Sequence, residues 1–312
     1  MRRSAADPTP TTSGTDASPS TLSADRVRRF RDRVLRWGEA NRRTFPWRLT
    51  RDPWRVLVSE VMLQQTQADR VVGYYEAFFA AFPTVEDCAR ARSSEVVRLW
   101  SGLGYNRRAL SLHAAARAIV ECHGGAVPSD EVALRTLPGI GPYTARAVLA
   151  LAFEAPVAPV DTNVIRVLAR SVAGTGLSAG AAQELADRLV PPDSAWAFTQ
   201  SLFDLGATVC TGTRPACASC PLQRQCRWWR AGLAEPDPWR ATPSARPQSA
   251  FAGSDRQGRG RLLHALRQGP VAAGALAEAC GWPDDQARSE RIGVALVAEG
   301  FAHWRGNLLR LR

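Results

Sequence analysis

The sequence contains no lysine, so all 40 of its basic residues are arginines. A chain without lysine cannot form a Schiff base through a side-chain amine, which excludes that form of covalent catalysis. Arginine instead presents a planar fork of donors that clamps a phosphate through two hydrogen bonds. Only 29 acidic residues oppose this charge, and the formal net charge of +11 favours nucleic acid as the partner. A basic surface that contacts only solvent is the alternative.

Long apolar runs are also missing. No run of about 18 apolar residues occurs, so we expect no membrane-spanning helix and no membrane partner. Residues 1–22 are rich in Ser, Thr, Pro and Ala and lack an apolar core, so we expect a disordered tail rather than a secretory signal. The seven cysteines are odd in number and four of them are clustered. This pattern argues against a disulfide framework and indicates a reducing cytoplasm.

Alternation typical of strands is absent before residue 300, whereas apolar residues recur at helical spacing throughout. The body of the chain is therefore predicted to be all-α. On the helix expected at 164–172, Val164 and Val167 should point inward, and Arg166 and Arg170 outward. The other helices are expected to begin near Ser23 and Pro53 and to span 74–82, 94–99, 107–120, 130–136, 142–153, 181–190 and 195–207.

The helix that starts near Pro53 carries a carboxyl group among apolar residues. Valine, leucine and methionine surround most of its circumference, which predicts a buried helix, and Glu60 projects between the directions of Val56 and Leu57. Burial raises the pKa of a carboxyl group, and a carboxyl protonated near neutrality is a general acid. A Glu60 paired with a nearby arginine is the alternative. The polar residues at 64–66 end the helix and suit base edges better than phosphates.

Residues 137–163 combine a glycine turn with a second carboxylate. The Pro-Gly-Ile-Gly segment at 138–141 is predicted to turn tightly between two helices, because glycine adopts positive φ freely. Pro142 is favoured at the first helical position, and the bare helix N-terminus beside exposed amides suits a phosphate. An extended return then delivers Asp161 to the head of another helix, which should keep its carboxylate ionised. An ordinary turn and an ordinary N-cap are the alternatives.

Two further segments carry chemistry. The loop at 100–106 holds two glycines and ends beside Tyr105, which either packs in a core or forms a wedge between bases, with Arg107 and Arg108 as phosphate clamps. Farther along, four cysteines follow a C-x6-C-x2-C-x5-C pattern that predicts a [4Fe–4S] cluster, since zinc sites more often use two short C-x2-C pairs. Zinc and four unrelated thiols are the alternatives. The cysteines are Cys210, Cys217, Cys220 and Cys226.

The C-terminal part differs in composition. Residues 231–254 form a Pro/Ala/Ser-rich linker, and about 60 residues follow it. Helices at 256–267, 271–280 and 283–299, then two short strands near 301–304 and 308–311, predict a winged-helix-like domain over 255–312. We expect this domain to grip flanking DNA through its terminal arginines. A role in stability or in binding a partner is the alternative.

Taken together, these motifs resemble a known family. The Leu-Pro-Gly-x-Gly hairpin, the Val-Asp-Thr-Asn segment at 160–163 and the cysteine loop resemble the helix-hairpin-helix DNA glycosylases related to endonuclease III. Within that superfamily, the segments at 59–67 and 102–105 are similar to the adenine-specific mismatch glycosylases, the MutY family. The resemblance covers roughly residues 25–230. It implies a two-lobed helical enzyme, with a six-helix barrel at about 53–155 and a cluster lobe formed by 23–52 and 156–230.

The resemblance implies removal of adenine mispaired with 8-oxoguanine or guanine. By position, Glu60 would protonate the departing adenine and Asp161 would stabilise or trap the sugar oxocarbenium ion. Tyr143 and Asn163 would position these carboxylates and the water. Bifunctional relatives carry lysine at position 143, so the tyrosine here implies a glycosylase without lyase activity.

The resemblance also implies three kinds of DNA contact. One pair of residues lines the pocket for the flipped base, four residues insert into the duplex or touch the opposite base, and two glycines bind a phosphate. These are, in turn, Trp47 and Arg48; Leu63, Gln65, Thr66 and Tyr105; and Gly139 and Gly141.

The family pattern is not matched everywhere. Asn106 stands where the family commonly has a second tyrosine, and the short C-terminal part differs from the Nudix-type domain of many members. Two other functions are kept as alternatives, an endonuclease III-like glycosylase for oxidised pyrimidines and a non-catalytic DNA-binding protein. We expect a monomer that binds double-stranded DNA in the cytoplasm, associated with the nucleoid.

Overall fold

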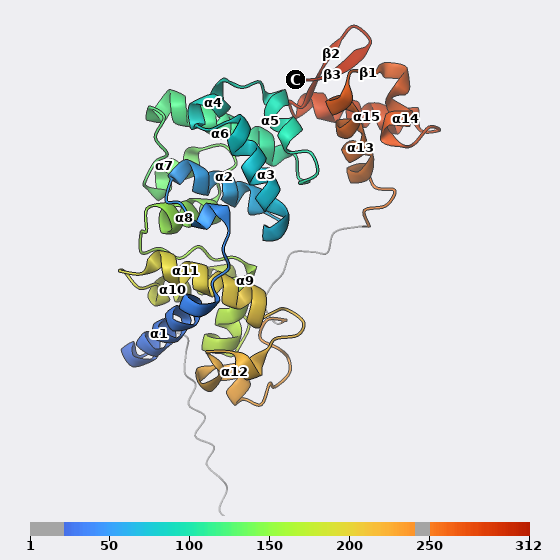
Figure 1. Ribbon diagram of the computed structural model, residues 1–312. Helices are drawn as coiled ribbons and strands as arrows, with labels where there is room; N and C mark the ends of the chain where they lie inside the picture. Colours follow the sequence, from blue (N-terminus) through green and yellow to red (C-terminus); the bar gives the residue numbers. More distant parts are fainter. Residues whose placement is uncertain (1–21, 241–249) are drawn as a thin grey trace, which may run out of the picture.

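The computed structural model describes residues 22–240 and 250–312. Within these ranges the chain forms two helical lobes and a C-terminal domain (Figure 1). We call 53–155 the barrel lobe, and 22–52 together with 156–240 the cluster lobe. The predicted two-lobed, mostly helical fold with a small C-terminal domain is confirmed. The predicted tail, apart from Leu22, and residues 241–249 of the predicted linker lie outside the described residues.

The barrel lobe begins with the buried helix that carries Glu60. Asp52 caps this helix by accepting a hydrogen bond from the Arg55 amide at 2.7 Å, and Pro53 occupies its first position. Most of the helix is buried, as predicted from its apolar circumference. The lobe contains α2 (Pro53–Leu63), α3 (Ala68–Ala81), α4 (Val85–Arg90), α5 (Ser93–Leu99), α6 (Arg107–His123), α7 (Glu131–Thr136) and α8 (Pro142–Ala152).

The cluster lobe joins the first helix to the segment after residue 155, so that α1 packs along α11. Ser23 caps α1, as predicted. The helix predicted at 164–172 is instead a short α-helix followed by a π-helical turn. The lobe contains α1 (Ala24–Asn41), α9 (Thr162–Leu168), α10 (Ala179–Leu189), α11 (Ala195–Asp204), α12 (Arg227–Arg230), the 3-10 turns η1 (Pro46–Arg48), η4 (Cys217–Ser219) and η5 (Gln223–Gln225), and the π-helical turns η2 (Ala169–Ala173) and η3 (Leu205–Val209).

The C-terminal domain has three helices and a three-stranded antiparallel sheet in the order β1-β3-β2. The helix predicted at 271–280 is wrong in its first half, because Val271 pairs with Leu309 in the sheet. A strand of two residues has no periodicity that a sequence pattern reveals. The domain contains α13 (Asp255–Gln268), β1 (Val271–Ala272), η6 (Ala273–Ala275), α14 (Leu276–Cys280), α15 (Gln286–Ala298), β2 (Ala302–Arg305) and β3 (Leu308–Leu311).

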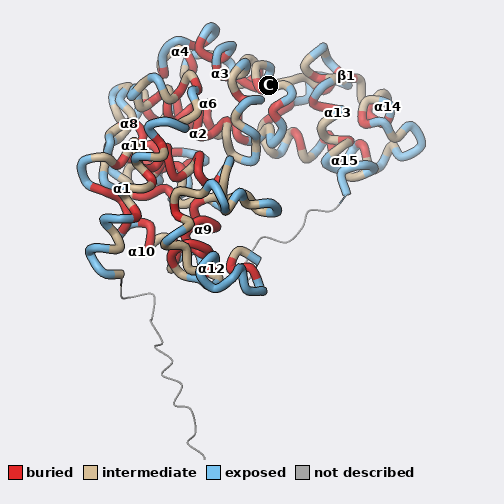
Figure 2. Tube along the Cα trace, turned by 60° about the horizontal axis from the view of Figure 1, so that its bottom comes forward, coloured by how far each residue is buried: buried red, intermediate tan, exposed pale blue. Residues whose placement is uncertain are grey.

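Buried apolar residues form two separate cores. One fills the barrel lobe and continues into the C-terminal domain, and the other fills the cluster lobe. Figure 2 shows the buried segments inside both lobes, with exposed loops at the periphery. The helices that carry the two predicted catalytic carboxylates therefore belong to different cores: α2 to the first and α9 to the second.

Candidate active site

Glu60 lies on α2 with only 4% of its surface exposed. The pKa of this carboxyl group is raised to about 7, chiefly by burial and also by the negative charge of Asp161, while hydrogen bonding to Tyr143 and the charge of Arg48 oppose the rise. A pKa near neutrality allows Glu60 to hold a proton and still release it readily. These are the properties of a general acid.

Tyr143 stands in the first turn of α8, which packs against α2. Its hydroxyl lies close enough to Glu60 to lower the pKa of that carboxyl group by hydrogen bonding to the charged form. Burial raises the pKa of Tyr143 well above its usual value, and the charges of Glu60 and Asp161 add to this shift. The phenol therefore stays protonated, and the charges of both carboxylates act on it.

Asp161 is the N-cap of α9, where its Oδ1 accepts a hydrogen bond from the Val164 amide at 2.8 Å. Its Oδ2 accepts another from Asn163 Nδ2, also at 2.8 Å. Burial nevertheless raises the pKa of Asp161 above its ordinary value, although these hydrogen bonds lower it. The hydrogen bonds at the helix terminus therefore favour the ionised carboxylate, as expected, while desolvation opposes them and has the larger effect on the pKa.

Arg166 connects the Asp161 pair to the cysteine loop. Its Nη2 donates to Asn163 Oδ1 at 2.6 Å and to the Gly206 carbonyl at 2.7 Å, while its Nε donates to the Cys210 carbonyl at 2.6 Å. The predicted outward orientation of Arg166 and Arg170 is wrong, since only 7% and 1% of their surfaces are exposed. Each reaches acceptors supplied by distant loops, which helical periodicity does not reveal.

Arg48 meets a carboxylate that the sequence analysis did not single out. Asp204 is fully buried and receives two hydrogen bonds from Arg48, at 2.6 and 3.0 Å. The Arg43 amide and Nε donate to the same carboxylate at 2.9 and 2.8 Å. Asp204 thus fixes the guanidinium whose charge acts on Glu60. It was missed because it lies 156 residues from Arg48 and no local motif marks it.

Trp47 lies in the core beside this ion pair, with 6% of its surface exposed. Its ring stacks on Phe45 with 4.9 Å between centroids and meets the edge of Tyr75 at 5.5 Å. The same short η1 segment therefore holds Trp47 in an aromatic stack and directs Arg48 toward Asp204.

The glycine hairpin joins α7 to α8. Gly139 adopts φ +78°, and a Cβ atom there would lie 2.5 Å from the Cβ of Ser111, so no other residue fits. Gly141 is the N-cap of α8 with φ −89°, so the prediction of positive φ holds only for Gly139. Both glycines are exposed, and the turn presents its backbone to solvent.

The predicted wedge residues lie at the tips of two loops of the barrel lobe. Gln65 and Tyr105 are exposed, and both adopt positive φ, at 55° and 46°. Leu63 and Thr66 are half-buried beside Gln65. The structure therefore brings these four residues to the lobe's surface. Arg108, predicted as a phosphate clamp, is buried instead.

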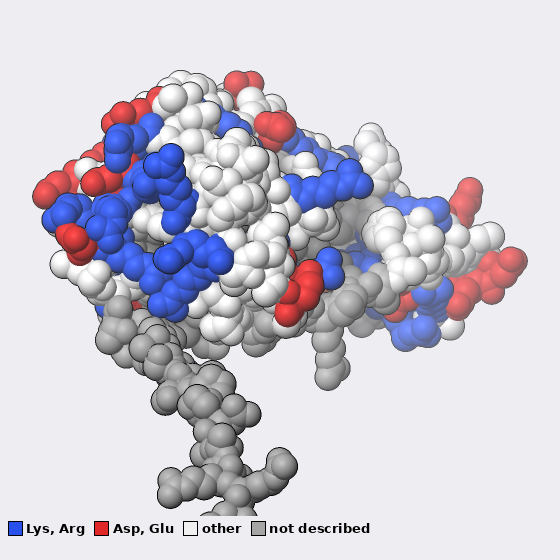
Figure 3. Space-filling model, turned by 90° about the horizontal axis from the view of Figure 1, so that it is seen from below, with Lys and Arg blue, Asp and Glu red and all other residues white. Residues whose placement is uncertain are grey.

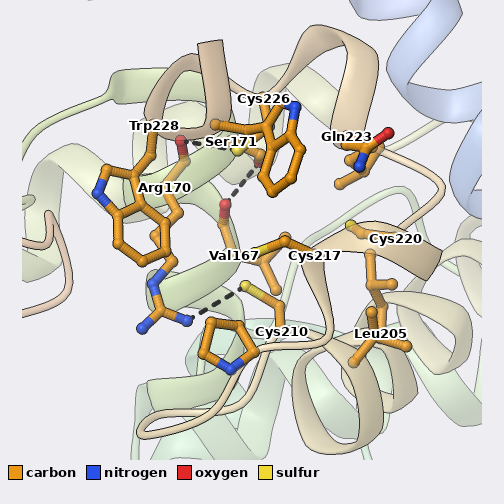
Figure 4. Close-up of a pocket in the computed structure, with 14 residues that line it drawn as sticks. Val167, Arg170, Ser171, Leu205, Cys210, Cys217, Cys220, Gln223, Cys226 and Trp228 are labelled. Atoms are coloured by element: carbon orange, nitrogen blue, oxygen red, sulfur yellow. Dashed lines mark hydrogen bonds between the residues drawn. The ribbon is translucent and has the colours of Figure 1, made fainter. Parts of the chain in front are cut away.

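Cys210, Cys217, Cys220 and Cys226 line one cavity in the cluster lobe (Figure 4). All four are free thiols, and Arg170 Nη1 approaches the Cys210 sulfur at 3.6 Å. The same arginine forms a buried ion pair with Asp237, from the start of the predicted linker. Residues around 237 therefore pack against the cysteine loop. Within 22–240 and 250–312, no three His, Cys, Asp or Glu side chains are grouped to hold a single metal ion.

Arginines gather on the face formed by α1 and α12. Arg26 lies close enough to Arg29, Arg227 and Arg230 for their charges to lower its pKa, although burial is the larger cause. Figure 3 shows basic patches on this side of the molecule and mixed charges over the C-terminal domain. Such a concentration of like charge attracts a polyanion. None of the described helices has the length and apolar character needed to cross a membrane.

Two carboxylates in different environments, both acting on a tyrosine beside a glycine hairpin, are an arrangement that a DNA base excision enzyme would use. The comparisons with known proteins agree. Residues 58–192 match the model of the HhH-GPD superfamily base excision DNA repair proteins. A thermostable thymine-DNA glycosylase superposes with a TM-score of 0.61 at 33% identity, over 66% of this chain and 97% of that one. An endonuclease III–DNA complex superposes with a TM-score of 0.60 at 22% identity, over 69% of this chain and all of that one, a likeness of fold.

Relatives of the whole chain narrow this class. The adenine DNA glycosylase of Mycolicibacterium smegmatis is 41% identical over 86% of this chain and 90% of its own. That of Mycobacterium tuberculosis is 42% identical over 86% and 88%. The human adenine DNA glycosylase is 41% identical over 64% of this chain and 39% of its own. The chain belongs to the adenine DNA glycosylase family of the HhH-GPD superfamily.

Proposed function

We propose that this protein excises adenine mispaired with 8-oxoguanine or guanine, as a monofunctional DNA glycosylase of base excision repair. The observation that carries the proposal is the group formed by Glu60, Tyr143 and Asp161. The curated relatives named as adenine DNA glycosylases support it and oppose the alternative of a glycosylase for oxidised pyrimidines. A non-catalytic DNA-binding protein would leave a buried carboxyl group with a pKa near 7 without a role.

In this proposal Glu60 donates its proton to the adenine ring as the glycosidic bond breaks. Tyr143 holds the carboxyl group through its hydroxyl, and Arg48 is held nearby by Asp204. The departing base then leaves as a neutral molecule. The buried surroundings of Glu60 supply a proton donor that is active at neutral pH.

Asp161 is proposed to stabilise or trap the oxocarbenium ion that forms on the sugar. The Val164 amide and the Asn163 side chain orient its carboxylate through hydrogen bonds, and Arg166 in turn fixes Asn163. Water then completes hydrolysis. Because Tyr143 occupies the position of a lysine in bifunctional relatives and the chain contains no lysine, we propose that the enzyme does not cleave the strand.

DNA binding is proposed to use the barrel-lobe loops and the hairpin. Gln65 and Tyr105 would insert into the duplex, Leu63 and Thr66 would contact the opposite base, and Gly139 and Gly141 would bind a phosphate. Trp47 and Arg48 would line the pocket for the flipped adenine. We propose that a monomer acts in this way at the nucleoid.

The cysteine loop is proposed to hold a structural [4Fe–4S] cluster through Cys210, Cys217, Cys220 and Cys226. Four thiols around one cavity are the donor set that such a cluster uses. The C-x6-C-x2-C-x5-C spacing supports a cluster over zinc, because zinc sites more often use two short C-x2-C pairs. When bound, the cluster would cross-link the loop.

The role of the C-terminal domain remains a prediction. Arg267 donates to Asn106 Oδ1 at 2.7 Å and to the Val97 carbonyl at 3.2 Å, and Ser93 donates to the Arg312 carbonyl at 3.0 Å. These contacts support the alternative in which the domain stabilises the barrel lobe. They also give Asn106, which departs from the family pattern, a specific partner.

A single-turnover assay on labelled duplexes tests the function. The duplexes carry adenine opposite 8-oxoguanine, adenine opposite guanine, or thymine glycol, and each reaction is analysed before and after hot alkali. We expect adenine-strand product only after alkali, which shows base removal without strand cleavage. Cleavage of the thymine glycol strand without alkali would refute the proposal. Iron analysis and the visible absorbance of the purified protein test the cluster.

A further inference from the structure

Arg108, the second residue of α6, has a role that phosphate binding does not explain. Its surface is only 9% exposed, and its guanidinium lies between the end of α2 and the loop that precedes α6. Burial lowers its pKa to about 10, so it still carries its charge at neutral pH. A buried guanidinium requires several acceptors, and these come from two separate segments of the barrel lobe.

The first group of acceptors lies at the C-terminal end of α2. The last carbonyls of a helix have no partner within it, and α2 has no basic residue in its last turn. Arg108 supplies the missing donors from another helix. Its Nη1 donates to the carbonyls of Val61, Met62 and Gln64 at 2.8, 2.8 and 2.6 Å.

The second group lies in the loop that carries Tyr105. Arg108 Nη2 donates to the Gly104 carbonyl at 3.0 Å and more weakly to the Leu103 carbonyl at 3.4 Å. Its Nε donates to the Tyr105 carbonyl at 3.4 Å. Nη2 also donates to Thr66 Oγ1 at 3.2 Å, which adds a second contact to the segment at the end of α2. One side chain therefore bridges both loops.

The two loops share an unusual backbone. Gln65 and Tyr105 are two of the four non-glycine residues with positive φ among those described. Such a conformation costs of order 1–3 kcal/mol and persists only where the surroundings fix it. Arg108 binds the carbonyl just before Gln65 and the carbonyl of Tyr105 itself. Its hydrogen bonds are thus placed to hold both strained residues outward.

We propose that Arg108 is a positioning residue that fixes Gln65 and Tyr105 in one preformed arrangement, so that both enter the DNA duplex together as adenine is flipped out. The inference rests on the proposed insertion of these two side chains. Lysine cannot take this role, because a single ammonium group lacks the planar fork that reaches both loops. Preorganisation lowers the cost of unstacking at the mismatch, and it matters less where adenine is already unpaired.

The experiment compares single-turnover excision rates, with enzyme in excess, on two duplexes. In one, adenine faces 8-oxoguanine; in the other, it faces a tetrahydrofuran abasic-site analogue and has no pairing partner. Arg108→Lys is compared with wild type and with Arg117→Lys, an exposed α6 arginine paired with Glu121. We expect Arg108→Lys to lose at least tenfold on the paired adenine and under threefold on the unpaired one, and Arg117→Lys to match wild type.

A double-mutant cycle with Tyr105→Ala separates the possible failures. If Arg108 acts through the wedge, adding Arg108→Lys to Tyr105→Ala should lower the rate little further. Equal losses on both duplexes, or no loss for Arg108→Lys while Tyr105→Ala is impaired, would overturn the role of Arg108. Full activity of Tyr105→Ala would instead overturn the proposed insertion. If Arg108→Lys is too unstable to purify, Arg108→Gln, whose single amide group cannot bind both loops, should show the same selective loss.

Discussion

Glu60 of the barrel lobe and Asp204 of the cluster lobe are both buried carboxylates on which Arg48 acts, yet their pKa values shift in opposite directions. Glu60, in the barrel lobe, lies among apolar side chains and burial raises its pKa to about 7. Asp204, in the cluster lobe, is fully buried as well, yet its pKa is lowered, because hydrogen bonds and charge from Arg48 and Arg43 outweigh desolvation. Burial alone therefore does not set the charge of a carboxyl group. The number of guanidinium partners does.

Because their carboxylates differ in pKa, the two lobes contribute different functions to the site. The barrel lobe supplies a carboxyl group that can hold a proton, and the cluster lobe supplies fixed charges and hydrogen bonds that orient their neighbours. Arg48 links the two carboxylates, since it donates hydrogen bonds to Asp204 and its charge also acts on Glu60. Removing a carboxylate charge should have opposite effects on stability in the two lobes.

The largest expected effect is the loss of the proton donor. Glu60→Gln keeps the shape of the side chain but cannot protonate adenine, so single-turnover excision should fall by about a thousandfold or more. Glu76→Gln, an exposed substitution on α3, is the matched control and should match wild type. A Glu60→Gln enzyme within tenfold of wild type would contradict the assignment of Glu60 as the acid.

The second largest expected effect is a loss of stability when the buried carboxylate of the cluster lobe is removed. Asp204→Asn leaves Arg48 and Arg43 without their shared carboxylate, and breaking a buried ion pair costs about 3–5 kcal/mol of unfolding free energy. Thermal unfolding should therefore occur roughly 10 °C lower. Asp25→Asn, which removes an exposed partner of Arg28, should shift the midpoint by under about 2 °C. A stability unchanged in Asp204→Asn would show that this ion pair is dispensable.

The third expected effect is a gain of stability in Glu60→Gln, opposite in sign to the loss in Asp204→Asn, and its size depends on pH. Because the folded-state pKa of Glu60 is about 7 against an ordinary value of 4.5, its contribution to stability is full below pH 4.5 and is lost as pH rises through 7. Glu60→Gln should thus be more stable than wild type at pH 8, by up to about 3 kcal/mol, and equally stable near pH 4.5.

Denaturant unfolding of wild type and Glu60→Gln at both pH values measures this difference. The wild-type excision rate, measured in parallel, should fall about tenfold per pH unit above pH 7, because the acid loses its proton. A variant destabilised at pH 8 would indicate that Glu60 is paired there rather than isolated among apolar groups.

The same contrast explains what sequence patterns predicted. Apolar residues around α2 predicted that the helix is buried and that Glu60 has a raised pKa, because periodicity within one segment carries that information. Arg166 and Arg170 were predicted to be exposed, because a charged residue in an amphipathic pattern is normally on the solvent side. Their acceptors at Cys210 and Asp237 come from loops far along the chain, so no local pattern indicates them.

The wedge loops show the same limit. The glycines around Tyr105 mark this residue in the sequence, whereas the pattern predicts a phosphate clamp at Arg108, which is buried and binds the Tyr105 loop. Arg107 and Arg108 are adjacent arginines that no local pattern distinguishes. Arg108 is the buried one, and it binds carbonyls at the end of α2, more than 40 residues earlier in the chain.

The smallest expected effect is the difference in stability between alanine substitutions at the two glycines of the hairpin. Here the space for a Cβ atom, and not charge, sets the cost. Gly139→Ala forces a side chain into positive φ and within 2.5 Å of the Ser111 Cβ, and should cost about 1–3 kcal/mol of stability and weaken duplex binding. Gly141→Ala meets no atom within 4 Å and has an ordinary φ, so it should cost about 0.5–1 kcal/mol, because alanine is a poorer N-cap. Thermal melts and titration of a labelled mismatch duplex compare the pair. Should Gly141→Ala weaken duplex binding as strongly as Gly139→Ala while its melt is unchanged, the open space beside Gly141 is occupied by DNA, and the phosphate lies closer to this residue than the backbone conformation alone requires.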